Sequence, residues 1–258
     1  IDHQEYLGNT RASVATEKAG ILRSGRPVVS GERDLPDTFF QAVERLGCQL
    51  VQRDRDFAVQ MQPDGQWTLN GEGGLGAARS LLLPPVRLPR DNLAVAVQAF
   101  WAAGLDLPDA ALGEALAAAS AAGRLESCEI DWQGQRRSLL LDVGHNPHAA
   151  AFLAESLRQQ GSRPRVAVFG LLADKDLQGV LAPLGGLFER WYVAPLPSPR
   201  SRSAHELQQA LEASGEQGQV AASVAAALAL ALSETSADTE IVIFGSFFCV
   251  ADAILWLS

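Results

Sequence analysis

Residues 139–152 read LLLDVGHNPHAAAF, and this stretch decides the fold class. An apolar run ends in Asp142, and a short turn brings His145, Asn146 and Pro147 ahead of an alanine-rich segment. Asparagine is a preferred N-cap and proline is favoured at the first helical position, so the pattern predicts a strand, a turn and a helix. Ligands of open α/β sheets bind beyond the carboxyl ends of the strands, which is where Asp142 and His145 would lie.

Similar runs recur downstream, separated by segments of helical length. The runs are RVAVFG (165–170), RWYVAP (190–195) and EIVIFG (240–245). Helices are expected at 147–159, 176–184, 205–213, 223–233 and 247–257. This alternation is typical of a parallel α/β sheet. Gly170, Ser246 and the Asp-Lys-Asp run at 174–176 follow the expected strands, so polar groups from three strand ends would converge on one cleft.

The first half of the chain is less regular. Helices are expected at 13–21, 35–47, 92–103 and 109–121, a strand at 27–31, and two short strands around the Pro-Asp-Gly turn within 57–69. The helix at 92 would take its cap from Asp91 or Asn92. The helical pattern ends in a small-residue turn at 121–123, before a hairpin at 127–139. We therefore expect two α/β pieces, residues 1–121 and 122–258.

The composition argues against a nucleic-acid-binding, membrane-bound or disulfide-stabilised protein. A net charge of −9 and a pI near 4.9 disfavour nucleic acid or an anionic membrane as the main partner. The cysteines at 48, 128 and 249 are odd in number and form no C-x-x-C pair, which fits a reducing cytoplasm better than a disulfide framework or a zinc site. The longest wholly apolar run, 224–232, is far shorter than the roughly 20 residues of a membrane span. The chain begins at Ile1 with a sequence typical of a domain interior, so we expect a fragment.

Two motifs match known binding patterns, but the sequence around each of them does not support a binding site. GEGGLG (71–76) matches the dinucleotide pattern G-x-G-x-x-G, but Pro84 and Pro85 follow too soon for the required helix, so a loop is expected. His145 and His148 have the i, i+3 spacing of metal ligands, but the sequence near them offers no third ligand.

Other polar residues near the expected sheet edge are equally open to a structural reading. Asn146 and Pro147 are explained by helix capping alone. Arg200 and Arg202 would either add positive charge to the cleft or be solvated loop residues.

Seven motifs together resemble the bacterial dihydrofolate synthase/folylpolyglutamate synthase family of the Mur ligase superfamily. They are DHQEYLGNTRASVATEKAGILRSGRPVV, DNLAVAVQAF, AAGRLE, LLLDVGHNPHAA, VFGLLADKDL, PLPSPR and IFGSFF, in that order. The resemblance implies the trailing part of a Mur-ligase-type ATP-binding domain at 1–121, followed by a Rossmann-like, glutamate-binding ligase domain with a mostly parallel sheet at 122–258.

The activity that the resemblance implies is an ATP-dependent ligation of L-glutamate to dihydropteroate and to folyl-(poly)glutamate through an acyl phosphate. The implied cofactors are ATP and Mg²⁺, with K⁺ as an optional second cation. The implied partners are small-molecule substrates (dihydropteroate, folates, L-glutamate and ATP), with no nucleic acid and no membrane, in an enzyme that is monomeric when complete.

The resemblance also implies roles for single residues. His3 matches the family's magnesium-binding histidine, and Lys18 matches a lysine that is carbamylated, which turns a cation into the oxygen ligand that Mg²⁺ prefers. From the residues alone, the better explanation of Lys18 is a solvated helix with an ordinary Glu17–Lys18 pair. The ATP-contacting positions match Asn92, Arg124 and Asp142, and the glutamate-binding positions match His145, Ser246 and Lys175, with His145 also counted as catalytic.

The chain departs from the family in one important respect. No G-x-x-x-x-G-K-[ST] phosphate-binding loop occurs in the 258 residues, so the chain alone is expected to lack ligase activity. A folylpolyglutamate-only enzyme, a Mur-type ligase of cell-wall precursors and a non-catalytic nucleotide-binding module remain alternatives.

Overall fold

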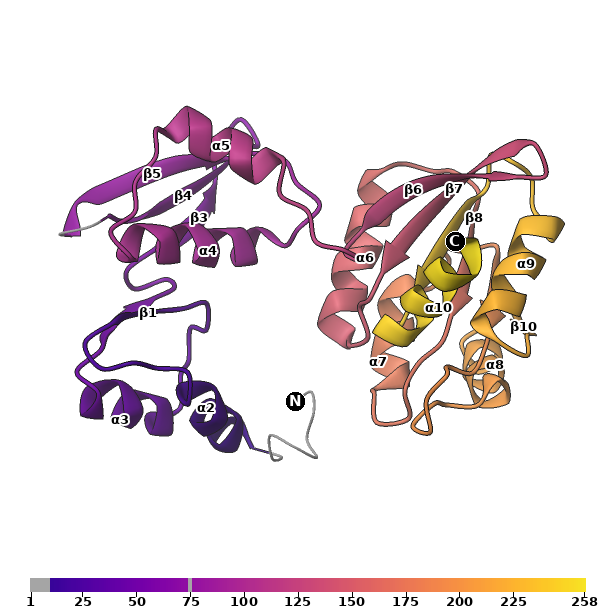
Figure 1. The fold of residues 1–258 in the computed structure, drawn as a ribbon, viewed down its shortest axis with the longest axis horizontal. Coiled ribbons are helices and arrows are strands. Elements are labelled where there is room, and N and C mark those ends of the chain that lie inside the picture. Colours follow the sequence, from indigo (N-terminus) through magenta and orange to yellow (C-terminus); the bar gives the residue numbers. More distant parts are fainter. Residues whose placement is uncertain (1–9, 74–75) are drawn as a thin grey trace. The chain divides into compact units, whose positions relative to one another are not determined.

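The computed structural model describes residues 10–73 and 76–258, which divide between Ala119 and Ser120 into two compact units (Figure 1). Residues 1–9, which include His3, and residues 74–75 lie outside the described part. Among the described residues, no helix is both long and apolar enough to cross a membrane.

The first unit contains four helices and five strands among its described residues. In chain order they are α2 (Arg11–Ala19), β1 (Pro27–Ser30), α3 (Asp37–Arg45), β2 (Gln49–Gln52), β3 (Ala58–Met61), β4 (Trp67–Glu72), β5 (Ala78–Leu83), α4 (Arg90–Ala102) and α5 (Asp109–Ala117). Strands β1 and β2 form a parallel pair, and β3, β4 and β5 form an antiparallel sheet. Helix α4 links these two sheets, because its Gln98 side chain bonds the main chain of Glu72 in β4 while Val95 lies against Gly31 after β1.

The second unit is a three-layer α/β domain. Its elements are β6 (Glu126–Trp132), β7 (Gln135–Asp142), α6 (Pro147–Gln159), β8 (Arg165–Phe169), α7 (Leu177–Leu181), the 3₁₀ turn Ala182–Leu184, β9 (Arg190–Val193), α8 (Ala204–Ala213), β10 (Gly218–Val220), α9 (Val224–Glu234), β11 (Glu240–Phe244) and α10 (Phe247–Leu257). The sheet has the order β10-β9-β8-β11-β7-β6, and every pair except the β6–β7 hairpin is parallel. The predicted fold class, α/β with a mostly parallel sheet, is confirmed.

Successive residues of the central strands alternate between two apolar cores, as the pleat of a strand requires. In β11, Ile241 and Ile243 face the core shared with α9 and α10, whereas Val242 and Phe244 face the core shared with α6, α7 and α8. Helices therefore cover both faces of the sheet, which is the normal state of a parallel sheet and explains its continuous apolar strands.

Several details differ from the sequence-based expectations. Strands β2, β5 and β10 were not predicted. Helix α4 begins at Arg90 with Pro89 as its N-cap, so the predicted cap at Asp91 or Asn92 is wrong. The helix expected at 176–184 is α-helical only to Leu181, because Pro183 lacks the N–H that would continue the ladder and the chain tightens into a 3₁₀ turn.

Candidate functional site

Three neighbouring strands of the second unit end together at one edge of the sheet. Strand β11 lies between β7 and β8, and Phe244 is in register with both Asp142 and Phe169. Gly170, which follows Phe169, and Ser246, two residues after Phe244, therefore lie at the same carboxyl edge as Asp142. Helices α6 and α10 begin a few residues after the ends of β7 and β11, so their N-termini bring N–H groups and positive potential to this edge.

Asp142 holds two loops in place at this edge. Its two carboxylate oxygens accept hydrogen bonds from the backbone N–H of Gly144, at 2.7 Å, and of Leu125, at 3.0 Å. Burial raises the pKa of Asp142 above its usual value, and these two hydrogen bonds and the charges of Arg124 and His145 oppose that rise only in part. The bond to Leu125 joins Asp142 to a loop that lies 17 residues earlier in the sequence. Arg124 is in the same loop, so its charge acts on Asp142.

His145 has a defined orientation. Its Nδ1 lies 2.9 Å from the carbonyl oxygen of Val143. A carbonyl can only accept, so Nδ1 carries the proton in the neutral ring and Nε2 carries the lone pair. The ring centroid lies 6.4 Å from that of Phe247 in the first turn of α10, which places His145 next to the N-terminus of that helix.

The turn that follows His145 is a helix cap, as predicted. The side chain of Asn146 accepts from Ala149 N at 2.9 Å, and Pro147 occupies the first turn of α6. His148 is exposed on this helix. The part of the chain that the structure describes contains no group of three or more His, Cys, Asp or Glu residues arranged to hold a metal.

Ser246 caps helix α10. Its buried hydroxyl accepts from Phe248 N at 3.2 Å. The preceding Gly245 has a φ of 108°, and a Cβ there would lie 2.4 Å from the carbonyl oxygen of Gly170. Only glycine fits at position 245, because other residues avoid such a φ and their Cβ would clash with the backbone of Gly170. The Gly-Ser turn therefore brings the start of α10 directly against the end of β8.

Lys175 lies in the loop after β8 and is almost fully buried. Its Nζ is 3.2 Å from a carboxylate oxygen of Asp174. Burial alone would raise the pKa of Asp174, but the hydrogen bond and charge of Lys175 and the charge of Arg200 outweigh it and keep that pKa below its usual value. Arg202 donates to the carbonyl oxygens of Ala173 at 2.9 Å and of Lys175 at 2.8 Å.

Arg202 thus has a role that differs from both of those that the sequence left open for it, because it bonds the main chain of a neighbouring loop. Its position in a loop after a strand does not distinguish a solvated arginine from one that holds a neighbouring loop. The structure shows that its guanidinium fixes the main chain on which Lys175 stands.

The remaining predicted residues lie in the first unit or outside the described residues. Lys18 is exposed in the last turn of α2, where a cation is also favourable for the helix dipole. Asn92 is exposed in the first turn of α4. His3 falls in the part of the chain that the structure does not describe. The described structure therefore gathers Arg124, Asp142, His145, Lys175 and Ser246 at one edge of the second unit, and their roles stay predictions.

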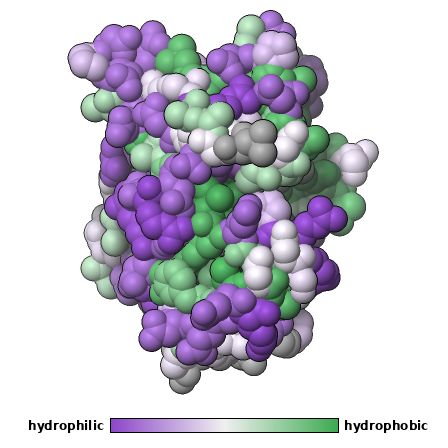
Figure 2. Space-filling model, turned by 90° about the vertical axis from the view of Figure 1, so that its left-hand side faces the viewer, coloured by the Kyte–Doolittle hydropathy of each residue, from purple (hydrophilic) through white to green (hydrophobic). Residues whose placement is uncertain are grey.

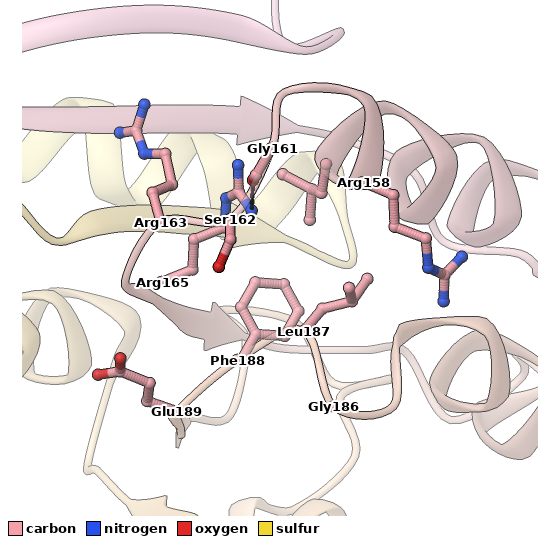
Figure 3. Close-up of a pocket in the computed structure, with 10 residues that line it drawn as sticks. Arg158, Gly161, Ser162, Arg163, Arg165, Gly186, Leu187, Phe188 and Glu189 are labelled. Atoms are coloured by element: carbon pink, nitrogen blue, oxygen red, sulfur yellow. Dashed lines mark hydrogen bonds between the residues drawn. The ribbon is translucent and has the colours of Figure 1, made fainter.

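A cavity of about 400 Å³ opens near the amino end of β8, away from this edge (Figure 3). Arg165 and Glu240 are almost fully buried beside it and form an ion pair with a distance of 2.8 Å, which Arg163 joins at 3.1 Å. Figure 3 shows the side chains of Arg158 and Arg163 extending in different directions rather than toward one point. Arg163 and Arg165 pair with the buried Glu240, and Arg158 and Arg165 donate hydrogen bonds to backbone carbonyls. Because these arginines already have partners within the protein, the carboxyl edge is the better candidate for a ligand site.

Comparisons with known proteins show which proteins the chain resembles. The Mur ligase, glutamate ligase domain family matches residues 123–247. The dihydrofolate synthase/folylpolyglutamate synthase of Escherichia coli (strain K12) is 34% identical over 252 residues, which are 97% of this chain and 56% of that protein. The folylpolyglutamate synthase of Lacticaseibacillus casei is 31% identical over 258 residues, covering 96% of this chain and 58% of that protein.

The solved structures that resemble this chain are of the same enzymes. E. coli FolC in complex with DHPP and ADP superposes with a TM-score of 0.80 at 33% identity, over 99% of this chain and 58% of that one. A bifunctional folylpolyglutamate synthase/dihydrofolate synthase with Mn, AMPPNP and L-glutamate bound gives 0.79 at 35% identity, over 99% and 59%. The chain spans less than two thirds of the length of these relatives. Residues 123–247 match the Mur ligase, glutamate ligase domain family, and nearly the whole chain is similar to dihydrofolate synthase/folylpolyglutamate synthases.

Proposed function

We propose that this chain supplies the glutamate-binding domain, and the trailing part of the ATP-binding domain, of a dihydrofolate synthase/folylpolyglutamate synthase. The reaction would be the ATP-dependent ligation of L-glutamate to dihydropteroate and to folyl-(poly)glutamate, through an acyl phosphate that the glutamate amine attacks. The observation that carries the proposal is the position of His145, Lys175 and Ser246 with the N-termini of α6 and α10 at the carboxyl edge of the second unit.

The geometry of that edge suits a small dicarboxylate. Helix N-termini favour a carboxylate through their N–H groups and dipoles, and the Lys175 ammonium adds a full positive charge. In this proposal, Lys175 orients the substrate carboxylates, and the Nε2 lone pair of His145 accepts a hydrogen bond from the glutamate ammonium group, so that the amine meets the acyl carbon. Arg124 and Asn92 contact the nucleotide. Asp142 acts by holding the Arg124 and His145 loops, since backbone N–H groups already engage both of its oxygens.

The cofactors in this proposal are ATP and Mg²⁺, with K⁺ as an optional second cation. Mg²⁺ would neutralise phosphate charge during phosphoryl transfer. The metal ligands proposed here are His3 and a carbamylated Lys18, because these residues match the metal-binding positions of the family that the sequence resembles. The carbamate would provide the oxygen that hard Mg²⁺ prefers. The Mur-type ligase of cell-wall precursors is the second candidate. A monomeric, cytoplasmic enzyme remains part of the proposal.

An assay of ADP release tests the substrate assignment. The 258-residue chain alone is expected to release no ADP above background, because it has no phosphate-binding loop. A form of the protein that contains such a loop is expected to release ADP when dihydropteroate or a folate, L-glutamate and Mg-ATP are all present. Release that instead requires a muramyl precursor would contradict the proposal and favour the second candidate.

In a form of the protein that contains the phosphate-binding loop, replacing His145 with alanine is expected to raise the KM for glutamate by about 10- to 100-fold, which corresponds to the ~1.5–3 kcal/mol of a hydrogen bond to a charged group. The KM for ATP should change by less than about twofold. The control is His148→Ala, because His148 is exposed on α6 three residues further along. A raised KM for ATP with an unchanged KM for glutamate would move His145 to the nucleotide site.

A further inference from the structure

L-Glutamate carries two carboxylates, so the proposed reaction requires two places on the protein that favour negative charge. A groove of about 580 Å³ in the first unit does not suit a carboxylate, because its lining is largely apolar, and Figure 2 shows a strip of hydrophobic surface on that unit. The arginines of the cavity at the amino end of β8 already have partners within the second unit. The loop after β9, in contrast, brings Arg200 and Arg202 to the carboxyl edge.

The loop after β9 lies against the loop after β8. The two strands are parallel neighbours, so they end at the same edge of the sheet. Beyond their ends, the backbone N–H of Ala173 donates to the carbonyl oxygen of Arg200 at 2.7 Å, and Leu172 and Ser201 form an antiparallel bridge. Main-chain atoms therefore hold Arg200 beside the loop of Lys175, and the side chain of Arg200 is not needed for this contact.

The guanidinium of Arg200 has only a loose partner. Its side chain is 43% exposed, and Nη1 lies 3.9 Å from one carboxylate oxygen of Asp174, which is beyond hydrogen-bond distance. Among the described residues, this is the only ion pair of Arg200. The other oxygen of Asp174 is 3.2 Å from Nζ of Lys175, whose side chain is only 4% exposed. Arg200 is thus the accessible cation of the cluster, and a guanidinium can bind a carboxylate through two parallel hydrogen bonds.

The order of the strands places Arg200 where the side chain of the substrate would end. Along the edge, the strands β7, β11, β8 and β9 are followed by His145, Ser246, Lys175 and Arg200. Neighbouring strands lie about 4.8 Å apart. A glutamate whose amine meets His145 and whose α-carboxylate lies at the start of α10 would extend its side chain across the end of β8. Its γ-carboxylate would then face Lys175 and Arg200.

We propose that Arg200 binds the side-chain carboxylate of the incoming amino acid and selects L-glutamate over its amide, L-glutamine. This inference rests on the proposed function. Lys175 and Arg200 carry one positive charge more than Asp174 balances, and Asp176 is engaged as the N-cap of α7. A γ-carboxylate would neutralise that charge, whereas the NH₂ group of an amide would face the N–H donors of Arg200. A site that is built to bond a substrate group rejects analogues that lack the group.

Titration of the 258-residue chain with L-glutamate and with L-glutamine, followed by the amide NMR shifts of the second unit, tests this selection. The parent chain should bind glutamate about tenfold or more tightly than glutamine. Arg200→Ala should weaken glutamate binding by about 10- to 100-fold, the effect of losing a charge-assisted hydrogen bond, and should change glutamine binding by less than about twofold. Arg200→Lys should keep part of the preference, because it retains the charge without the bidentate geometry.

Arg190→Ala is the matched control. The side chain of Arg190 is 45% exposed, and Arg190 is the first residue of β9, so it lies at the opposite edge of the sheet, where it pairs with Glu234 at 3.0 Å. This variant should bind both amino acids as the parent chain does. Arg200→Ala should melt like the parent chain, because main-chain contacts hold its loop.

Three results would overturn the role of Arg200. They are equal weakening of glutamate and glutamine binding in Arg200→Ala, unchanged glutamate binding in that variant, and no saturable binding of glutamate by the parent chain. Because the titration measures binding, its outcome is separate from ADP release. If the chain selected glutamate through Arg200 but a form with the phosphate-binding loop released no ADP with folate substrates, only the proposed function would fail. If that form ligated glutamate and Arg200→Ala kept the preference, only the role of Arg200 would fail.

Discussion

Replacing Lys18 with alanine is expected to lower the turnover of a form of the protein that contains the phosphate-binding loop by about 10²- to 10³-fold, the usual cost of removing one group that stabilises developing charge. An unmodified lysine would repel Mg²⁺, whereas a carbamate would offer it oxygen ligands. Steady-state ADP release with and without added acetate checks this expectation. Acetate should restore part of the turnover, because a short carboxylate can replace the missing oxygen ligand.

The control for Lys18 must separate chemistry from helix stability. Lys18 occupies the last turn of α2, so its removal also costs a favourable interaction with the helix dipole. Arg45 occupies the last turn of α3, so Arg45→Ala removes a cation from the same position of another helix. This variant should keep near-normal turnover. Wild-type turnover in Lys18→Ala, or the absence of an acid-labile CO₂ adduct in the intact mass of the parent protein, would contradict the carbamate hypothesis.

The second unit could be predicted well because each element carries its own local signal. Apolar runs of strand length ending in Gly or Asp marked β7, β8 and β11, and Asn146–Pro147 marked the start of α6 at the residue where the structure begins it. Parallel strands place their carboxyl ends at one edge, so the convergence of Asp142, Lys175 and Ser246 followed from the order of elements.

What could not be predicted depends on long-range contacts. The neighbours of a side chain are set by the tertiary structure, so nothing in the sequence indicated that Asp142 bonds the backbone of Leu125 or that Arg202 holds the Lys175 loop. Strand β10 has three residues, and it is a strand only because β9 lies next to it. Such short edge strands have little intrinsic propensity to reveal them.

Replacing Glu240 with alanine is expected to destabilise the second unit by about 3–5 kcal/mol, because it would leave a buried arginine without its counter-charge. Glu240 is 3% exposed and Arg165 is 4% exposed, and their ion pair closes the amino end of β8 and β11. Urea unfolding followed by the signal of the second unit measures the change. Glu129 pairs with Arg136 on the surface of the same sheet, and Glu129→Ala should cost less than about 1 kcal/mol.

A double variant distinguishes the loss of an attraction from the cost of an isolated buried charge. Arg165→Met with Glu240→Leu removes both charges and keeps the side-chain volume, so it should recover most of the stability lost in Glu240→Ala. The hydrogen bond from Arg165 Nη1 to the carbonyl oxygen of Gly161 would also be lost, and full recovery is therefore not expected. If the double variant were no more stable than Glu240→Ala, the pair itself would contribute net attraction, and desolvation of Arg165 would not be the main cost.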